Sequence, residues 1–329
     1  MKKLLLVFSI IYVFLLVLPF GISSNWRYTY GGSGNEYCYS VHELSEGGFI
    51  AGGSTTSQGN GGEDFWLLKL DSEGLEIWNK TFGNNTNEKA FDMQKTSDNG
   101  FVMAGYRSND FSCGVSGCKF DFYIIKTNSS GDLLWEKVFY TFDGDEAYSI
   151  QETSDEGFII TGRREGAGGN DWDENGNWGM NYDLWLIKTN SSGDLEWEKT
   201  FGSSWPEWAY SAKETSDGGF IISGFKSISF YPGEGYDQHN LWLIKTNSSG
   251  DLEWEKTFGG SYDEDMYSLF ETADNGFIMA GHTESTSEDF KSDFWILKVN
   301  DSGIEEWNKT FGEIGIEKAY YIENTSDGG

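Results

Sequence analysis

Residues 184–224 read LWLIKTNSSGDLEWEKTFGSSWPEWAYSAKETSDGGFIISG, and this stretch holds every part of a unit that recurs along the chain. The parts are an apolar run (LWLIKT), a tryptophan segment (LEWEKTF), an alanine-aromatic segment (WAYSAKET) and a Gly-Phe-Ile segment (GFIISG). Self-similarity at a regular period is the signature of a repeat architecture. The repeat therefore decides the fold.

Spacing within the unit is constant except in one connection. From each segment tryptophan the next alanine-aromatic segment follows at a fixed distance, the Phe of the Gly-Phe-Ile segment follows at another, and the aromatic residue of the apolar run precedes its tryptophan by 12 residues. Only the step from that Phe to the next apolar run varies, taking the values 17, 22, 27, 22 and 18. The segment tryptophans are Trp26, Trp78, Trp135, Trp197, Trp254 and Trp307.

Each segment has the character of a β-strand. The segments are short, rich in aromatic and branched residues, and bounded by SDGG-type and NSSGD-type turns that suit tight hairpins. The apolar run has no polar alternation, so its strand must be covered on both faces. Four strands per unit with one doubly buried strand are what a propeller blade needs. We predict an all-β fold, a β-propeller of four-stranded antiparallel blades, over residues 24–329, with no helix in that range.

The sequence does not contain a whole number of four-stranded blades. The chain opens with a fourth strand at Trp26, runs through five complete blades and reaches only the first strand of another before Gly329. A ring clasped by the N-terminal strand would still lack two strands. We therefore expect the sequence to be truncated, with six to eight blades in the intact protein.

The units resemble the repeat propellers of secreted archaeal and bacterial proteins. The stretch NSSGDLEW, with its turn glycine Gly193 and with Trp197 four residues later, is also similar to the tryptophan-docking motif of pyrroloquinoline-quinone propellers. The resemblance covers nearly all of residues 25–329. It implies a propeller fold and says little about activity, because such blades serve many functions.

The N-terminus has the features of an export signal. Lys2 and Lys3 precede an apolar run from Leu4 to Phe20, and small residues follow. We predict a signal peptide over residues 1–23 and a secreted or cell-surface protein. The alternative is an uncleaved membrane anchor, because the run approaches the length of a membrane-spanning helix.

The charge balance restricts the partners. The chain has 53 acidic and 23 basic residues, a net charge of −30. Such a field repels phosphate backbones, which excludes nucleic acid as a partner.

The three cysteines and the sequons fit an exported protein. We predict a small disulfide between Cys113 and Cys118. Cys38 takes the place of an alanine or methionine in the other blades, which predicts a small buried apolar side chain. Glycosylation sequons, which make a surface glycoprotein plausible although several arise from turn chemistry, begin at Asn79, Asn84, Asn128, Asn190, Asn247, Asn300, Asn308 and Asn324.

Aromatic residues gather in the connections of variable length and in the crossings between blades. If the strands follow in order, these connections share one face, where binding usually resides. Exposed rings beside acidic and amide groups suit sugar stacking or a protein hot spot, whereas the alternative is that the rings pack together to order long loops. The predicted ligand-binding residues, which lie near His239, are Trp172, Trp178, Trp205, Trp208, Tyr231 and Tyr236.

One long connection resembles the start of a calcium loop. Its residues Asp171, Asp173, Asn175 and Asn177 follow the D-x-D-x-N-G pattern of hard oxygen ligands with a glycine bend. Tyr182 stands where an EF-hand carries its bidentate Glu. Calcium is the one cofactor that we predict, and a solvated polar loop is the alternative.

A carboxylate recurs at the start of every first strand. Such a residue either attracts a cation or accepts backbone N–H groups at the strand start, and we favour the structural role. The six positions are Glu36, Glu88, Asp145, Glu207, Glu264 and Glu317.

The sequence has no catalytic signature. His42, His239 and His282 are the only histidines, and none lies in a hydrolase or metalloprotease motif. We predict a non-enzymatic binding or scaffolding module that recognises a glycan or an extracellular protein. The alternative is an extracellular enzyme, either a quinone-dependent dehydrogenase or a polysaccharide-active enzyme, although the adjacent cysteines of many quinone enzymes are missing.

Overall fold

The computed structural model describes residues 27–108, 119–140, 144–165, 182–203, 205–230, 237–285, 291–313 and 315–323. Every regular element in these ranges is a β-strand, which confirms the all-β prediction. The described residues contain no helix long and apolar enough to cross a membrane. The predicted signal peptide, residues 1–23, lies outside the described residues.

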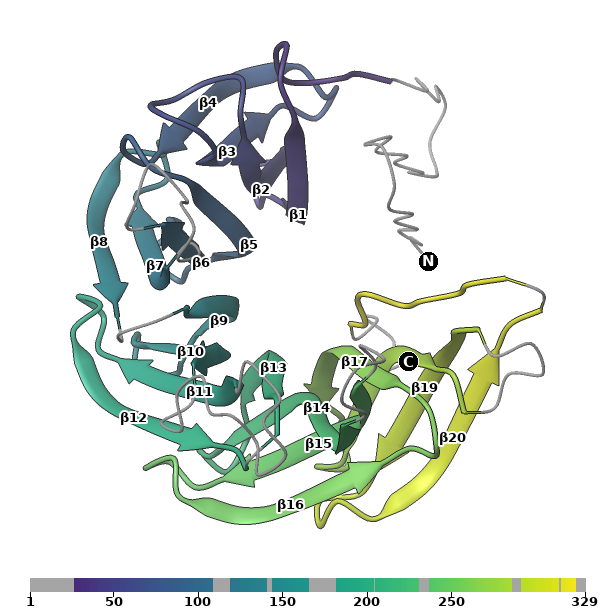
Figure 1. Cartoon of the computed structure of the whole chain (residues 1–329). Helices are drawn as coiled ribbons and strands as arrows, with labels where there is room; N and C mark the ends of the chain where they lie inside the picture. The colour runs from purple at the N-terminus through teal and green to yellow at the C-terminus, as the bar shows by residue number, and fades with distance from the viewer. Residues whose placement is uncertain are drawn as a thin grey trace. The chain divides into compact units, whose positions relative to one another are not determined.

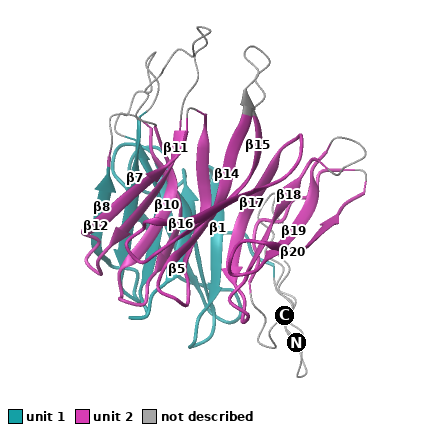
Figure 2. Cartoon of the chain, turned by 90° about the horizontal axis from the view of Figure 1, so that it is seen from below, with its two compact units in different colours: residues 1–139 teal, residues 140–329 magenta. Residues whose placement is uncertain are grey.

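The chain divides into two compact units, residues 1–139 and 140–329, which are coloured separately in Figure 2. In the first unit, two four-stranded sheets follow one another along the chain (Figure 1). Their strands are β1 (Glu36–Glu43), β2 (Phe49–Thr55), β3 (Asp64–Leu70), β4 (Glu76–Phe82), β5 (Glu88–Lys95), β6 (Phe101–Ser108), β7 (Phe120–Thr127) and β8 (Leu133–Phe139).

The second unit has three sheets of the same kind. All pairs of neighbouring strands are antiparallel and consecutive in sequence. The strands are β9 (Glu146–Glu152), β10 (Phe158–Glu165), β11 (Tyr182–Thr189), β12 (Leu195–Phe201), β13 (Glu207–Glu214), β14 (Phe220–Phe230), β15 (Asp237–Thr246), β16 (Leu252–Phe258), β17 (Glu264–Glu271), β18 (Phe277–Thr283), β19 (Asp293–Val299) and β20 (Glu305–Phe311).

The repeated turns close the hairpins as predicted. In the turn between β5 and β6, Asn99 has φ 64° and its N–H donates to the Thr96 carbonyl at 2.9 Å. In the turn between β7 and β8, the Asn128 side-chain oxygen accepts the N–H of Ser130 and of Asp132, each at 2.9 Å. Asn and Asp side chains commonly replace backbone acceptors in this way. Turn chemistry therefore sets the register of both hairpins.

Apolar side chains from consecutive sheets interdigitate within each unit. In the first unit Ile50 and Leu67 pack with Met93 and Met103 of the next sheet, and all four are fully buried. In the second unit equivalent clusters join each sheet to the next. The third strand of each sheet is buried on both faces, as the unbroken apolar run predicts.

The segment tryptophans dock on glycines of the following sheet. A Cβ built on Gly131 would lie 2.8 Å from the ring of Trp78, and one on Gly250 would lie 2.6 Å from the ring of Trp197. Each ring thus covers the turn between the third and fourth strands of the next sheet. Sheets in the strand order 1-2-3-4, packed face to face on one another within each unit, are the blades of a β-propeller. The fold class is therefore as predicted.

The structure lacks strands at two places where the sequence predicted them, at the beginning and at the end of the described residues. Residues 27–30 are not in a strand, and neither are residues 315–323. A strand needs a partner for its hydrogen bonds, and the described residues include no further strand of either blade. Residues 315–323 nevertheless pack on the last sheet, where the Ile322 N–H donates to Ser268 Oγ at 3.2 Å, as the Met93 N–H donates to Ser40 Oγ in the first unit.

Candidate functional site

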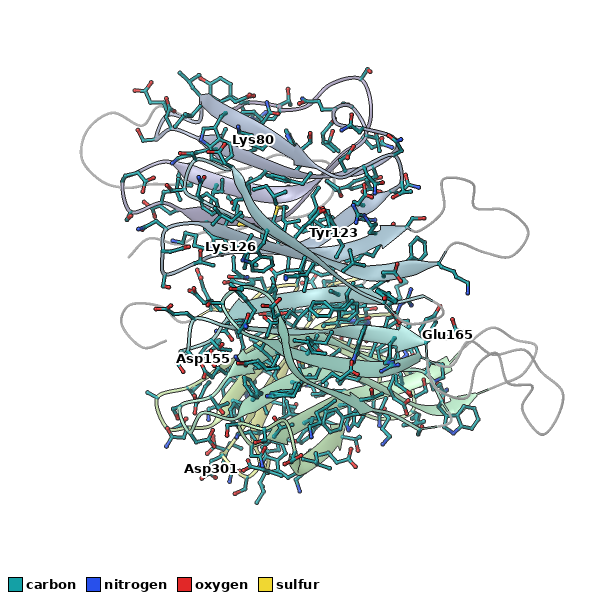
Figure 3. All side chains as sticks on the ribbon, turned by 90° about the vertical axis from the view of Figure 1, so that its left-hand side faces the viewer. Lys80, Tyr123, Lys126, Asp155, Glu165 and Asp301 are labelled. Carbon is teal, nitrogen blue, oxygen red and sulfur yellow. The ribbon has the colours of Figure 1, made fainter. Side chains whose placement is uncertain are left out.

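Each sheet has a constant end and a variable end. Because the strands are antiparallel and in sequence order, the two hairpin turns of each sheet lie at one end. The connection from second to third strand and the crossing to the next sheet lie at the other end. Figure 3 shows this in the second unit, where the turn residues Asp155 and Asp301 lie on one side and Glu165, at the end of β10, on the other. The predicted separation of constant and variable connections is therefore confirmed within each unit.

At the variable end, a few positions differ from sheet to sheet although their neighbours repeat. The first position follows the recurrent carboxylate of the first strand. The second follows the glycine of the second strand. The third lies directly before the polar residue that begins the apolar run. The first two are cross-strand partners in each sheet. In the second unit these positions are occupied by Glu146, Arg163 and Tyr182, by Trp208, Phe225 and His239, and by Asp265, His282 and Ser292. We call these nine residues the variable-end cluster.

Arg163 joins the first two sheets of the second unit. Its Nη2 lies 3.0 Å from Glu146 Oε2. Its guanidinium carbon lies 4.3 Å from the centre of the Tyr182 ring and 4.7 Å from that of Trp208. A guanidinium that is ion-paired and also lies over the rings of two aromatic side chains is held in one orientation.

His239 continues the cluster into the next sheet. The ring of Phe225 lies 4.5 Å from that of Trp208 and 4.2 Å from that of His239. His239 Nδ1 is 3.4 Å from Asp263 Oδ1, and His239 Nε2 is 3.2 Å from Asp265 Oδ1, although the latter contact lacks hydrogen-bond geometry. Burial acts against the charged form of Asp265, but the His239 contact, together with His282 and Lys318, outweighs it and lowers the pKa of that carboxyl.

His282 closes the cluster at the last sheet. Its Nε2 faces the Lys318 ammonium at 3.2 Å, and its Nδ1 faces the Tyr267 hydroxyl at 3.3 Å. An ammonium only donates, so we assign the ring proton to Nδ1. Burial, with repulsion from Lys318 and His239, outweighs the attraction of Asp265 and lowers the pKa of His282 to about 4. His282 is therefore neutral at physiological pH.

A row of tyrosines runs beside the cluster along the first strands of the second unit and ends at Tyr320, in the segment that packs on the last sheet. The ring centres of Tyr148 and Tyr210 are 5.8 Å apart, those of Tyr210 and Tyr267 are 5.0 Å apart, and those of Tyr267 and Tyr320 are 4.9 Å apart. Tyr320 is half exposed. Offset and tilted rings at these distances attract one another and stiffen the strands that carry them.

The structure separates the predicted aromatic residues into different roles. Trp205, in the crossing between β12 and β13, is 39% exposed, whereas Trp208 is half-buried among the rings of the cluster. Trp208 thus fits the alternative of rings that order their own surroundings. The other predicted binding residues, Trp172, Trp178, Tyr231 and Tyr236, lie outside the described residues.

Sequence reasoning missed Tyr262. It lies in the crossing between β16 and β17, is also 39% exposed, and stands two residues before a first-strand carboxylate, as Trp205 does. This shared spacing could have identified Tyr262 from the sequence. Two exposed rings therefore occupy equivalent places on consecutive sheets.

The predicted calcium ligands and disulfide stay predictions. Asp171, Asp173, Asn175 and Asn177 lie outside the described residues, and so do Cys113 and Cys118. Within the described ranges, no group of three or more His, Cys, Asp or Glu side chains is arranged to hold a metal ion. Cys38 is a free thiol that is half-buried, less enclosed than predicted.

The recurrent first-strand carboxylates have the structural role that we favoured. Four of the six accept the N–H of the residue four positions earlier and so fix the crossing, while Asp145 accepts the N–H of Glu165 at 3.3 Å. The distances are 3.2 Å for Gly32 to Glu36, 3.2 Å for Asn84 to Glu88, 3.1 Å for Ser203 to Glu207 and 2.9 Å for Gly260 to Glu264.

No protein-family model matches the chain, and no curated protein matches its sequence. Among solved structures, it is similar to the β-propeller domain of the Trilobed protease from Pyrococcus furiosus, with 10% identity over 79% of this chain and 68% of that one and a TM-score of 0.42. It is also similar to a mutant of the Synechocystis apocarotenoid oxygenase, with 12% identity over 82% of this chain and 59% of that one and a TM-score of 0.43. Sqt1 from Chaetomium thermophilum shares 10% identity over 83% of this chain and 71% of that one, with a TM-score of 0.40.

Proposed function

We propose that this protein is an exported, non-enzymatic binding module that recognises a glycan at the variable end of its second unit. The observation that carries the proposal is that residues departing from the repeat gather at this end, beside the exposed rings of Trp205 and Tyr262. Departures from a uniform repeat at the ends of rigid strands are where a scaffold accommodates a ligand. The rest of each sheet is occupied by repeated packing and turn residues.

The two exposed rings suit a sugar chain. Trp205 and Tyr262 lie at equivalent positions of neighbouring sheets, so an extended ligand can contact both. Aromatic faces stack on the C–H faces of pyranose rings, and neighbouring carboxylates and amides accept and donate hydrogen bonds to hydroxyl groups. Because the charge is −30, we expect the glycan to be neutral or cationic.

The loops that carry the two rings are fixed by hydrogen bonds of their backbone N–H groups. The Trp205 N–H donates to Ser203 Oγ at 3.2 Å, and Ser203 in turn is bound to Glu207. The Tyr262 N–H donates to Ser285 Oγ at 3.1 Å. A preorganised loop loses little conformational freedom on binding, which favours affinity.

The proposal predicts that both rings contribute to binding. We expect Trp205→Ala and Tyr262→Ala each to weaken binding to a polysaccharide about tenfold or more, because exposed aromatic anchors dominate such contacts. Affinity electrophoresis against a panel of neutral and amino-sugar polysaccharides measures this. Leu252→Ala is the control, since Leu252 is 49% exposed but begins β16 at the constant end. Equal weakening by all three variants, or by none, would remove the proposal.

The same panel tests the enzymatic alternative. Among the described residues, Asp265, Tyr267 and His282 form one hydrogen-bonded group with acid–base chemistry. Specific cleavage of any polysaccharide that disappears in Asp265→Asn would replace the binding module with an enzyme. Binding to an extracellular protein without any glycan binding would instead show that the ligand is a protein.

A further inference from the structure

Two buried carboxylates meet where the first sheet joins the second. Asp64 begins β3 and is 1% exposed, and Glu88 begins β5 and is fully buried. The Glu88 N–H donates to the Glu63 carbonyl at 2.6 Å, so the two strand starts lie side by side. A Cβ built on Gly83 would collide with both Asp64 Oδ1 and Glu88 Oε2, which shows that the two oxygens converge on this glycine.

The two carboxylates differ in how many of their oxygens have partners. Glu88 Oε1 accepts the Thr86 hydroxyl at 2.6 Å and lies 3.4 Å from Arg107 Nε, while its Oε2 accepts the Asn84 N–H. Asp64 Oδ2 accepts the Asn60 N–H at 3.0 Å, but Asp64 Oδ1 is buried without a hydrogen-bond partner. A buried, ionised oxygen with no donor next to a second carboxylate is strongly disfavoured. Asp64 is therefore the member of the pair that a proton would stabilise.

We propose that Asp64 is a proton-binding site at the junction of the first two sheets, which holds a proton in mildly acidic medium and loses it, with loss of stability, in alkaline medium. The proposal does not depend on the glycan-binding function. Burial and then the Glu88 charge raise the pKa of Asp64 to about 7, in agreement with the geometry.

The groups around Asp64 come from each element packed against it. Glu88 on β5 is the charge that opposes ionisation of Asp64, and Arg107 on β6 is paired with Glu88. On β2, Thr55 is the cross-strand partner of Asp64 and bonds to Glu36, and the crossing after β4 contributes Gly83. No cation among the described residues forms an ion pair with Asp64.

The second unit repeats the arrangement and also contains a natural variant of it. A Cβ on Gly202 would collide with Asp183 Oδ1, which has no hydrogen-bond partner, and burial raises the pKa of both Asp183 and Glu207. One junction later the aspartate is replaced by Asn240, and a Cβ built on Gly259 would collide with both Asn240 Oδ1 and Glu264 Oε2. A neutral side chain of the same shape is thus accommodated at this position.

The sign of the pH effect follows from the direction of the shift. Because the pKa of Asp64 is raised on folding, its contribution is fully present below the unfolded value near 3.8 and is lost as the pH rises through about 7. His282 acts in the opposite sense, since its lowered pKa favours the folded state above about pH 6.5. The Asp64 effect is therefore isolated by comparing a variant with the parent protein at each pH.

Asp64→Asn and Asn240→Asp in the full chain form a matched pair for the test. We expect Asp64→Asn to raise the melting temperature at pH 8 relative to the parent protein, by about 3 °C more than at pH 5. We expect Asn240→Asp to lower it at pH 8 and to have a smaller effect at pH 5. Infrared spectra should show a protonated carboxylic acid band at pH 5 that is weaker in Asp64→Asn.

Three outcomes would overturn the proposal. The first is the same melting-temperature difference between Asp64→Asn and the parent protein at both pH values. The second is an infrared band that the substitution does not change, which decides the matter even if Asn240→Asp does not fold. The third is stabilisation of the parent protein at pH 8 by calcium chloride that is lost in Asp64→Asn, because a metal ion would then occupy the place of the proton.

Discussion

Substituting Gly250 by alanine is expected to destabilise the second unit by about 3 kcal/mol, combining left-handed backbone strain with overpacking. Gly250 has φ 75°, and a Cβ there would lie 2.6 Å from the ring of Trp197. The ring cannot withdraw freely, because it packs on Phe220 at 5.6 Å between ring centres. Denaturant unfolding followed by tryptophan fluorescence measures the change.

Gly218 provides a control of nearly equal backbone geometry. It has φ 79°, and a Cβ there would meet nothing within 4 Å. Gly218→Ala should therefore cost only the backbone strain, about 1 kcal/mol. Similar losses in both variants would show that the docked tryptophan does not hold consecutive sheets together.

Removal of the Arg163 side chain is the second change with a large expected effect. Arg163→Ala would leave the Glu146 carboxylate, which is 8% exposed, beside aromatic rings without its cation. Breaking one side of a buried ion pair costs about 3–5 kcal/mol, and loss of the stacking on Tyr182 and Trp208 adds to it. The free energy of unfolding at pH 7 should fall accordingly.

The neighbouring Arg164 separates this effect from the loss of any arginine. Its guanidinium stacks on Trp185 at 4.9 Å and bonds to Thr200 in an exposed setting. Arg164→Ala should cost about 1 kcal/mol or less. If Arg163→Ala lowers the free energy of unfolding no more than Arg164→Ala does, the contacts of Arg163 do not stabilise the variable-end cluster as proposed.

The strands and turns were predictable because their signals are local. The NSSGD turn, the SDGG-type turn and the unbroken apolar run each specify their own conformation within a few residues. These local features required no knowledge of which sheet packs on which. The resemblance of NSSGDLEW to a tryptophan-docking motif implied a docked ring for Trp197, but it did not identify Gly250 of the next sheet as the partner.

The cluster at the variable end was not predictable in the same way. Arg163 meets Trp208, and His239 meets Asp265, only because consecutive sheets pack face to face. Trp205 and Trp208 look alike in sequence, yet one lies in a crossing and the other is the second residue of β13. Comparison of equivalent positions between blades contained the missing signal, since the residue after each first-strand carboxylate changes from Tyr37 to Lys89, Glu146, Trp208, Asp265 and Lys318.

Burial of the junction carboxylates likewise depends on the three-dimensional arrangement. The aspartate that lies two residues before the third-strand aromatic was not singled out from the sequence, because one acidic residue in so acidic a chain is a weak signal. Only the packing of β3 beside β5 shows that Asp64 Oδ1 has no donor. Only in that environment does the presence of Asn240 at the equivalent position show that a neutral side chain is accommodated there.

Hydroxyl-radical footprinting of the protein with a bound polysaccharide tests the position of the binding surface most directly. Trp205 is 39% exposed at the variable end, and Trp307, on the outer strand β20, is 40% exposed. A ligand at the variable end should reduce oxidation of Trp205 and Tyr262 several-fold and leave Trp307 unchanged. Protection of Trp307 with Trp205 unaffected, or no binding by any polysaccharide in the panel, would contradict the account.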